Sequence, residues 1–241
     1  MATINSVLGE IDSKDLGFTL MHEHVMVAAS GLSIHYPDLL GPNREERAIE
    51  CLKTAKAHGI DTMLDATTFD LGRDPALLKT VAQASGVNLI NVTGWWLDVP
   101  RFMQGVGANQ MADEFIKDLT EGFRGTDIKA GMLKCAADFE GVTPPLETMA
   151  RAVARAHLQT GVPIMVHSYP TGQVARRQIA IFKEEGVDLG RVKIDHSNDT
   201  TDTEYLKWIL DQGCFLGLDR YPGRLVSPHM RTVTLKNLMA V

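Results

Sequence analysis

Cysteine is scarce in this chain of 241 residues, and the three cysteines are scattered and odd in number. Cys51, Cys135 and Cys214 therefore argue against a disulfide framework and for a reducing compartment, which favours a cytoplasmic protein. The simplest expectation for each of them is a small buried hydrophobic side chain.

The sequence also lacks a basic run and an apolar run long enough to cross a membrane. The N-terminal residues contain no basic region followed by an apolar core, so we expect neither a signal peptide nor a membrane partner. The formal net charge of −6 argues against nucleic acid as a partner. With 44% hydrophobic and 22% charged residues, the composition is that of a globular protein with a sizeable core.

What the chain does contain is a short apolar run followed by a helical pattern, repeated along its length after a hairpin-like lead-in over residues 4–18. The predicted strands are 18–25, 62–66, 87–93, 130–135, 163–167, 192–195 and 214–218. The predicted helices are 44–58, one from 74–75, 110–124, 144–160, 172–185, 202–212 and one from 228. The strands are continuous apolar runs, which is typical of a sheet buried on both faces.

This alternation predicts an α/β fold of the (β/α)8 TIM barrel type. A doubly wound open sheet is the alternative, but it requires a glycine-rich turn after the first strand, and none is present. A barrel needs eight strands, and the sequence ends at Val241, where the eighth would begin. We therefore expect residues 1–241 to form a single barrel domain that lacks its eighth strand and helix. Another segment or subunit would then have to fill the gap, unless the chain is truncated.

Two histidines in the first predicted strand are the first candidates for chemistry. In a strand, side chains alternate between faces, so His22 and His24 point to the same side and can share a cation. A lone His-x-His is a weak signal, because it is more often a polar strand end. The prediction gains weight because His167 and His196 end two later strands, and barrel active sites lie at the C-terminal strand ends. Four converging imidazoles would repel one another if protonated, and a divalent metal removes that problem.

Lys134 ends the fourth predicted strand at the same level. An ammonium beside metal cations would be strongly disfavoured, so the lysine either extends outward, pairs with Asp65 or Asp138, or is modified. The modified form that suits the site is a carbamate made with carbon dioxide, which is an anion able to bridge two metals.

Five motifs resemble the phosphotriesterase family of the amidohydrolase superfamily, and the resemblance covers nearly the whole chain. They lie at 18–24 (FTLMHEH), 67–74 (TTFDLGRD), 93–100 (TGWWLDVP), 130–134 (AGMLK) and 195–200 (DHSNDT). The resemblance implies a binuclear site in which His22 and His24 bind the more buried metal and His167 and His196 the more exposed one. Carboxylated Lys134 would bridge both ions, most often zinc, with cobalt, manganese or iron as alternatives.

The mechanism that the resemblance implies is hydrolysis by a hydroxide that bridges the metals and attacks a phosphotriester, lactone or aryl ester. Asp199 matches a position that helps to move the proton outward, although it could equally be a helix N-cap. An aspartate that ends the eighth strand in the family has no counterpart before Val241. The alternative hypothesis is therefore a truncated barrel with weak metal binding and little or no activity, and a third is an amidase or deaminase of the same superfamily.

Substrate specificity is predicted less sharply. Trp96 matches an aromatic residue of the leaving-group pocket, and Leu97, Trp95 and Phe102 would extend an apolar wall, unless they only pack their loop or a dimer contact. Arg220 resembles the lactonase branch, where it could steer a substrate carbonyl or pair with Asp199. We expect a small-molecule ester, lactone or organophosphate as substrate, and a homodimer.

Overall fold

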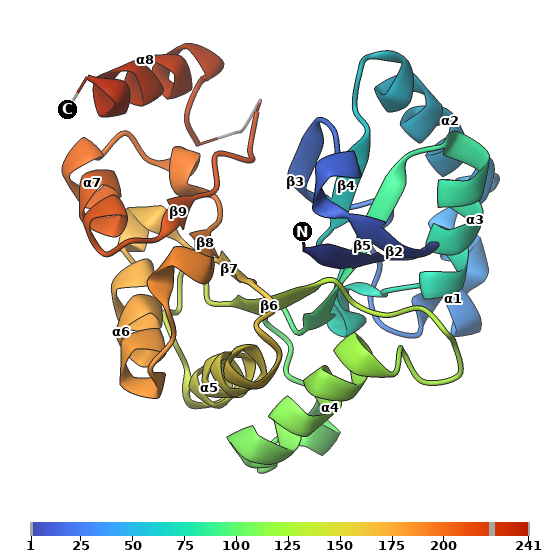
Figure 1. Cartoon of the computed structure of the whole chain (residues 1–241), viewed down its shortest axis with the longest axis horizontal. Helices are drawn as coiled ribbons and strands as arrows, with labels where there is room; N and C mark the ends of the chain where they lie inside the picture. The colour runs from blue at the N-terminus through green and yellow to red at the C-terminus, as the bar shows by residue number, and fades with distance from the viewer. Residues whose placement is uncertain (1, 222–224, 241) are drawn as a thin grey trace. The chain divides into compact units, whose positions relative to one another are not determined.

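The computed structural model describes residues 2–221 and 225–240. The chain forms two compact units (Figure 1). The N-terminal unit comprises Met1–Asp98 and Asp113–Leu133, and the C-terminal unit comprises Val99–Ala112 and Lys134–Val241. The chain passes from one unit to the other between Asp98 and Val99, within α4 (Ala108–Thr120) and within β6 (Met132–Ala136).

The N-terminal unit is a β/α layer that follows a short hairpin. The hairpin pairs β1 (Thr3–Ser6) with β2 (Gly9–Asp12) in antiparallel fashion. The following strands are parallel and follow one another in sequence order: β3 (Thr19–Glu23), β4 (Thr62–Asp65) and β5 (Asn88–Gly94). Every residue of β4 is buried, as expected for a strand that is covered on both faces.

Helices α2 (Arg44–Ala57) and α3 (Pro75–Ser85) connect these strands. The start of α3 was predicted from Asp74 and Pro75, and the Asp74 side chain does accept a hydrogen bond from the Leu77 backbone N–H. The loop predicted after the first strand contains the short helices α1 (Leu32–His35) and η2 (Pro37–Leu40), which the sequence pattern did not indicate.

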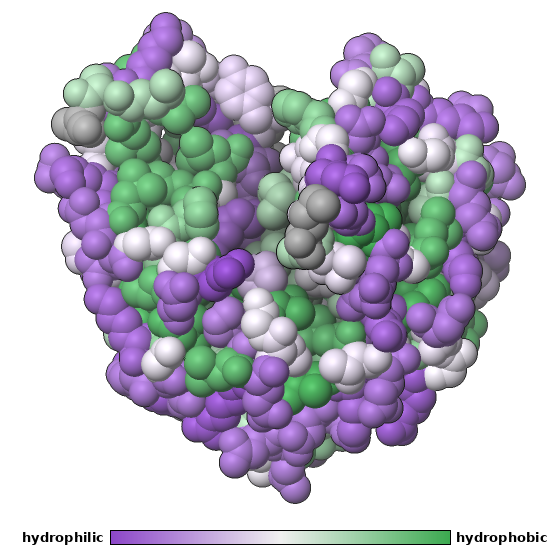
Figure 2. All heavy atoms as spheres, in the orientation of Figure 1, coloured by the Kyte–Doolittle hydropathy of each residue, from purple (hydrophilic) through white to green (hydrophobic). Residues whose placement is uncertain are grey.

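The C-terminal unit repeats the same arrangement. Strands β7 (Ile164–His167), β8 (Val192–Ile194) and β9 (Phe215–Leu216) are parallel and neighbour each other in sequence order. The helices of this unit are α5 (Pro144–Thr160), α6 (Ala175–Glu185), α7 (Thr203–Asp211) and α8 (Pro228–Met239). A small cavity of about 110 Å³ is lined by residues of α7 and α8, among them Leu206, Leu235 and Leu238. Figure 2 shows hydrophobic side chains gathered over this part of the C-terminal unit.

Parallel strands that alternate with helices confirm the predicted (β/α) barrel class. Seven such strands, β3 to β9, fall within residues 2–221 and 225–240, and an eighth is not found there. The expectation that residues 1–241 form a single domain stays a prediction. Within the same described residues, no helix combines the length and apolar character needed to span a membrane.

The cysteines only partly match expectation. Cys135 and Cys214 are buried, and burial raises the pKa of each thiol to about 12, so both are inert at neutral pH. Cys51 is exposed on α2, so the prediction of a buried side chain is wrong for this residue. The buried residues of this helix are Ala48 and Leu52.

Candidate metal centre and its polar network

The N-terminal unit holds the first pair of predicted ligands. His22 lies on β3 and is buried, and His24 follows the strand directly. Their ring centroids are 5.4 Å apart, with the rings inclined by 65°. Strand periodicity alone therefore brings these two imidazoles together, as the sequence predicted.

A hydrogen-bond chain orients the His24 ring. Its Nδ1 lies 2.9 Å from the Thr67 hydroxyl oxygen, which in turn donates to Oδ1 of Asp65 at 2.8 Å. Because the hydroxyl proton is directed at the carboxylate, the hydroxyl oxygen accepts from Nδ1–H of His24. This tautomer places the imidazole lone pair on Nε2, which is the form a metal ligand requires.

The C-terminal unit holds the second pair, which comes from two neighbouring strands. His167 ends β7, and His196 follows β8, whose Ile194 is in register with Val166 of β7. Nδ1 of His167 and Nε2 of His196 are 2.8 Å apart, and the ring centroids are 4.4 Å apart. Both side chains are buried, so the pair is shielded from bulk water.

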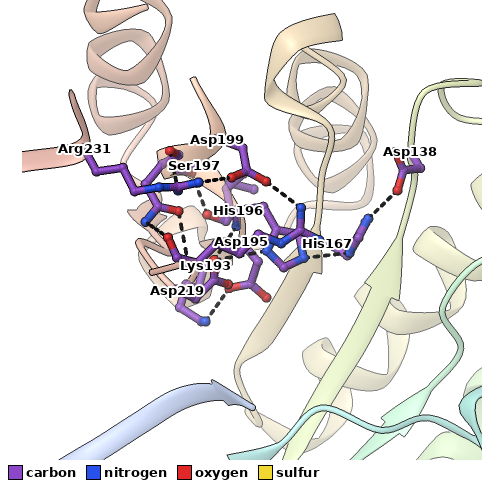
Figure 3. A network of polar contacts seen from close by, with 12 residues as sticks. Asp138, His167, Lys193, Asp195, His196, Ser197, Asp199, Asp219 and Arg231 are labelled. Carbon is purple, nitrogen blue, oxygen red and sulfur yellow. Dashed lines mark hydrogen bonds and ion pairs between the residues drawn. The ribbon is translucent and has the colours of Figure 1, made fainter. Parts of the chain in front are cut away.

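A carboxylate flanks each of these two rings (Figure 3). Oδ2 of Asp138 lies 2.8 Å from Nε2 of His167. Oδ1 of Asp219 lies 3.1 Å from Nδ1 of His196 and accepts from the His196 backbone N–H at 3.0 Å. The result is a four-residue chain in which both ends carry negative charge and both central groups can carry a proton.

Burial is the main reason why the pKa of His167 falls to about 4; the hydrogen bond to Asp138 opposes this shift, and the nearby His196 and Lys134 add to it. The hydrogen bond from His167 in turn lowers the pKa of Asp138. His167 is therefore neutral, and Asp138 ionised, at neutral pH.

The number of protons available to these four side chains tests whether the arrangement suits a metal ion. Three contacts need three N–H groups, and the two imidazoles supply only two if both are neutral. If each ring donates its outer N–H to its carboxylate, the two inner nitrogens face each other with lone pairs. A cation bound by these inner nitrogens would satisfy both rings, and carboxylates that orient metal-binding histidines are a recurrent arrangement.

Lys134 lies on β6 in the same unit and is only 1% exposed. The alternative that it extends outward to solvent is therefore wrong. Asp138 was one of the two proposed partners, and it interacts with His167 instead. A carbamate at this depth would be a buried anion, and bound cations would compensate its charge.

The turn after β8 places His196 and the residues that follow it. His196 has a φ of 60°, in the left-handed region that non-glycine residues seldom adopt. The segment that follows β9 can approach this turn closely because residue 217 is glycine. A Cβ at this position would lie 2.5 Å from Oδ1 of Asp195. The Ser197 backbone N–H donates to the Gly217 carbonyl across this turn at 2.9 Å.

Asp199 lies in η7 (Ser197–Asp199), directly after this turn. It does not cap the following helix, because Asp202 accepts from the Tyr205 backbone N–H and fills that role. Instead, Asp199 pairs with two arginines: Arg220, one of the predicted alternatives for that residue, and Arg231 of α8. Arg231 is a residue that the sequence patterns did not single out.

The predicted substrate residues Trp96 and Leu97 lie half-buried in the N-terminal unit. The carboxylate of Asp70 fixes their loop by accepting from the Trp96 backbone N–H at 3.0 Å. Trp95 is buried and packs edge-to-face on Phe115, with ring centroids 4.9 Å apart, so it belongs to the core. Contact of Trp96 and Leu97 with a substrate stays a prediction.

The structure thus places the five predicted ligands in two groups, with His22 and His24 in one unit and Lys134, His167 and His196 in the other. That all five share one centre stays a prediction. Sequence reasoning missed Asp219 as a partner of His196, although it directly precedes Arg220. It named Asp138 only as a partner for Lys134.

Comparison with known proteins agrees with the resemblance in the motifs. A profile of the phosphotriesterase family matches residues 2–240. The chain is 40% identical to the phosphotriesterase homology protein of Mycobacterium tuberculosis (strain ATCC 25618 / H37Rv), over 98% of this chain and 76% of that protein. It is 41% identical to the aryldialkylphosphatase of Saccharolobus solfataricus, over 88% of this chain and 68% of that protein.

A more distant relative carries a different name. The N-acetyltaurine hydrolase of Dictyostelium discoideum is 32% identical, over 74% of this chain and 49% of that protein. Since the family profile spans nearly all residues and the identity reaches 40% over almost the full chain, the chain belongs to the phosphotriesterase family of metal-dependent hydrolases.

Proposed function

We propose that this chain is a binuclear metal-dependent hydrolase that acts on small phosphotriesters, lactones or aryl esters. The observation that carries the proposal is the row of hydrogen-bonded side chains Asp138, His167, His196 and Asp219. In this row, two carboxylates orient two buried imidazoles toward each other. This arrangement suits a cation better than it suits a hydrogen bond between two neutral rings.

The residues that would hold the metals are the two imidazole pairs, with Lys134 as a carbamate between the ions. Zinc is the first expectation, because imidazole and carboxylate-type ligands suit it, and the same donors accept cobalt, manganese or iron. When bound, the two ions would supply a water molecule acidic enough to ionise near neutral pH and a Lewis acid for the substrate oxygen.

The other proposed residues act on the substrate. The Arg220 side chain is 43% exposed, so its guanidinium can reach a bound molecule and stabilise negative charge on a carbonyl or phosphoryl oxygen. Trp96 and Leu97 would supply an apolar surface for the leaving group or acyl part. Together these residues would bind and orient an uncharged ester.

The test is metal content followed by a substrate panel. We expect protein produced with zinc and bicarbonate to hold about two metal ions per chain, measured by inductively coupled plasma mass spectrometry. The panel comprises paraoxon, phenyl acetate and acyl-homoserine lactones. N-acetyltaurine is included because a relative bears the name of an amide hydrolase. Turnover of the amide alone would replace the ester proposal with an amidase.

Matched histidine variants show whether turnover depends on the proposed ligands. His167→Asn and His196→Asn should lose metal and activity. His229→Asn, an exposed histidine of the same unit, should keep both. Full metal content in the first two variants would overturn the assignment of these ligands.

We also propose that the protein is a cytoplasmic homodimer. The three cysteines are free, which is compatible with a reducing compartment. Light scattering coupled to size-exclusion chromatography gives the mass in solution, and a single mass of one chain would exclude the dimer.

A further inference from the structure

Arg231 lies in the first turns of α8 and is almost completely buried, with 4% of its surface exposed. Its guanidinium makes three hydrogen bonds. Nε donates to the Val226 carbonyl at 3.0 Å, Nη1 to the Asn198 carbonyl at 2.6 Å and Nη2 to Oδ1 of Asp199 at 2.7 Å. A buried arginine of this kind ties α8 to the turn that follows β8 (Figure 3).

Asp199 is shared between two arginines that differ in exposure. Its Oδ1 binds buried Arg231, and its Oδ2 accepts from Nη1 of Arg220. The side chain of Arg231 is 2% exposed and that of Arg220 is 43% exposed. The pair with Arg231 is shielded from solvent and fixed by further backbone contacts, whereas the Arg220 guanidinium stays partly accessible to solvent.

Asn198 fixes the backbone of Arg220 in the same place. Its side-chain amide donates to the Arg220 carbonyl at 2.9 Å, while its own carbonyl accepts from Arg231. Arg231 therefore binds both residues that contact Arg220: it binds the carboxylate of Asp199 and the backbone carbonyl of Asn198.

We propose that Arg231 is a positioning residue: it fixes Asp199 as the docking point of Arg220 and so sets the place from which Arg220 reaches the substrate. The part that concerns the substrate rests on the proposed function. Because both oxygens of Asp199 accept from guanidinium groups, this arrangement gives Asp199 the task of holding Arg220. The resemblance had implied proton transfer for this residue.

The first test is a double-mutant cycle on kcat/KM with a panel substrate that the protein turns over. Arg220→Met should lower kcat/KM by about 100-fold, the cost of removing one donor to a developing negative charge. Arg231→Met should cause much of the same loss, and the double variant should be no worse than Arg220→Met alone. Additive losses would overturn the proposal, because independent roles add.

The second test does not require activity. Side-chain ¹⁵N spectra of the arginines report whether the Arg220 guanidinium is held. We expect the Arg220 signals to shift and average in Arg231→Met and to stay unchanged in Lys236→Met, which removes an exposed charge from the same helix. Unchanged Arg220 signals in Arg231→Met would overturn the proposal.

A conservative variant separates positioning from general stability. Arg231→Lys keeps the charge but cannot make three bonds at once, so it should fold and show an intermediate change of the Arg220 signals. If it matches wild type in these spectra while melting earlier, Arg231 is only structural and the proposal fails. If no panel substrate is turned over while the spectra change as expected, the hydrolase proposal fails and the link from Arg231 to Arg220 stands.

Discussion

The two imidazole pairs reach similar ring separations by different means. His22 and His24 come from one strand, and their ring centroids are 5.4 Å apart. His167 and His196 are 29 residues apart in sequence, and their centroids are 4.4 Å apart. The first pair needs only the period of a strand, whereas the second needs two parallel strands in the correct register.

Their partners differ as well. The ring of His24 is oriented by the neutral hydroxyl of Thr67, while His167 and His196 are each oriented by a carboxylate. A carboxylate makes the imidazole a stronger ligand than a hydroxyl does. We therefore expect metal binding by the pair in the C-terminal unit to depend more on its orienting partners than metal binding by the pair in the N-terminal unit.

The largest effect should follow from removing one ligand of either pair. His24→Asn and His167→Asn should each hold about one metal ion fewer per chain. Each should lose activity by roughly 10³-fold, since metal-ion catalysis contributes several kcal/mol. Metal analysis and kcat/KM on the same samples measure both quantities. If one of these variants kept both ions, its histidine would be excluded as a ligand.

Replacing Lys134 should have the next largest effect. Lys134→Met keeps most of the length of the side chain but cannot react with carbon dioxide. We expect at least a 100-fold loss of activity and reduced metal content.

Lys207→Met, an exposed lysine on α7, is the matched control and should behave as wild type. An unmodified structural lysine predicts normal metal content for Lys134→Met. Intact-mass spectra under bicarbonate provide the direct check on the carbamate.

The contrast between the orienting partners predicts a smaller effect. Asp138→Asn and Asp219→Asn should each weaken metal binding by about 10–100-fold, the usual range for such carboxylates. Thr67→Val removes only a neutral partner of His24, so we expect a loss of about tenfold or less. Competition with a chelator gives the affinities. Equal losses in all three variants would remove the distinction between the two pairs.

One pair is formed within a single strand and the other between two strands, and this difference explains what could be predicted from the sequence. The strands, the cap of α3 at Asp74 and the pairing of His22 with His24 follow from local periodicity and propensity, which act over a few residues. His167 and His196 could be predicted as partners only through the barrel, because their contact depends on the register of β7 and β8.

Most contacts between distant side chains could not be predicted, although the pairing of Arg220 with Asp199 was one of the predicted alternatives. Arg231 follows its helix start by a few residues and looks like any surface arginine of a helix. Only the approach of α8 to η7 buries it against Asp199. Asp138 and Asp219 follow strands and have the right chemistry, but nothing in their spacing assigns either to a particular histidine.

The smallest expected effect compares ion pairs of the two units. In the C-terminal unit, Glu185 bridges Arg151 and Arg155 between α5 and α6, and hydrogen bonds from Arg155 lower its pKa. In the N-terminal unit, burial raises the pKa of Asp118 despite its pairing with Arg73. The two carboxylates therefore have opposite effects on stability as the pH changes.

A lowered pKa in the folded state means that the stability contributed by Glu185 is present above the unfolded pKa and lost as the pH falls through the folded pKa. Glu185→Gln should therefore cost about 1 kcal/mol at pH 7 and almost nothing in strong acid. A raised pKa means that protonated Asp118 favours the folded state, so wild type loses this stability as the pH rises. The loss of unfolding free energy caused by Asp118→Asn should therefore be smallest at high pH. Urea unfolding at several pH values measures both differences, and a cost for Glu185→Gln that grew toward acid pH would contradict the lowered pKa of this carboxylate.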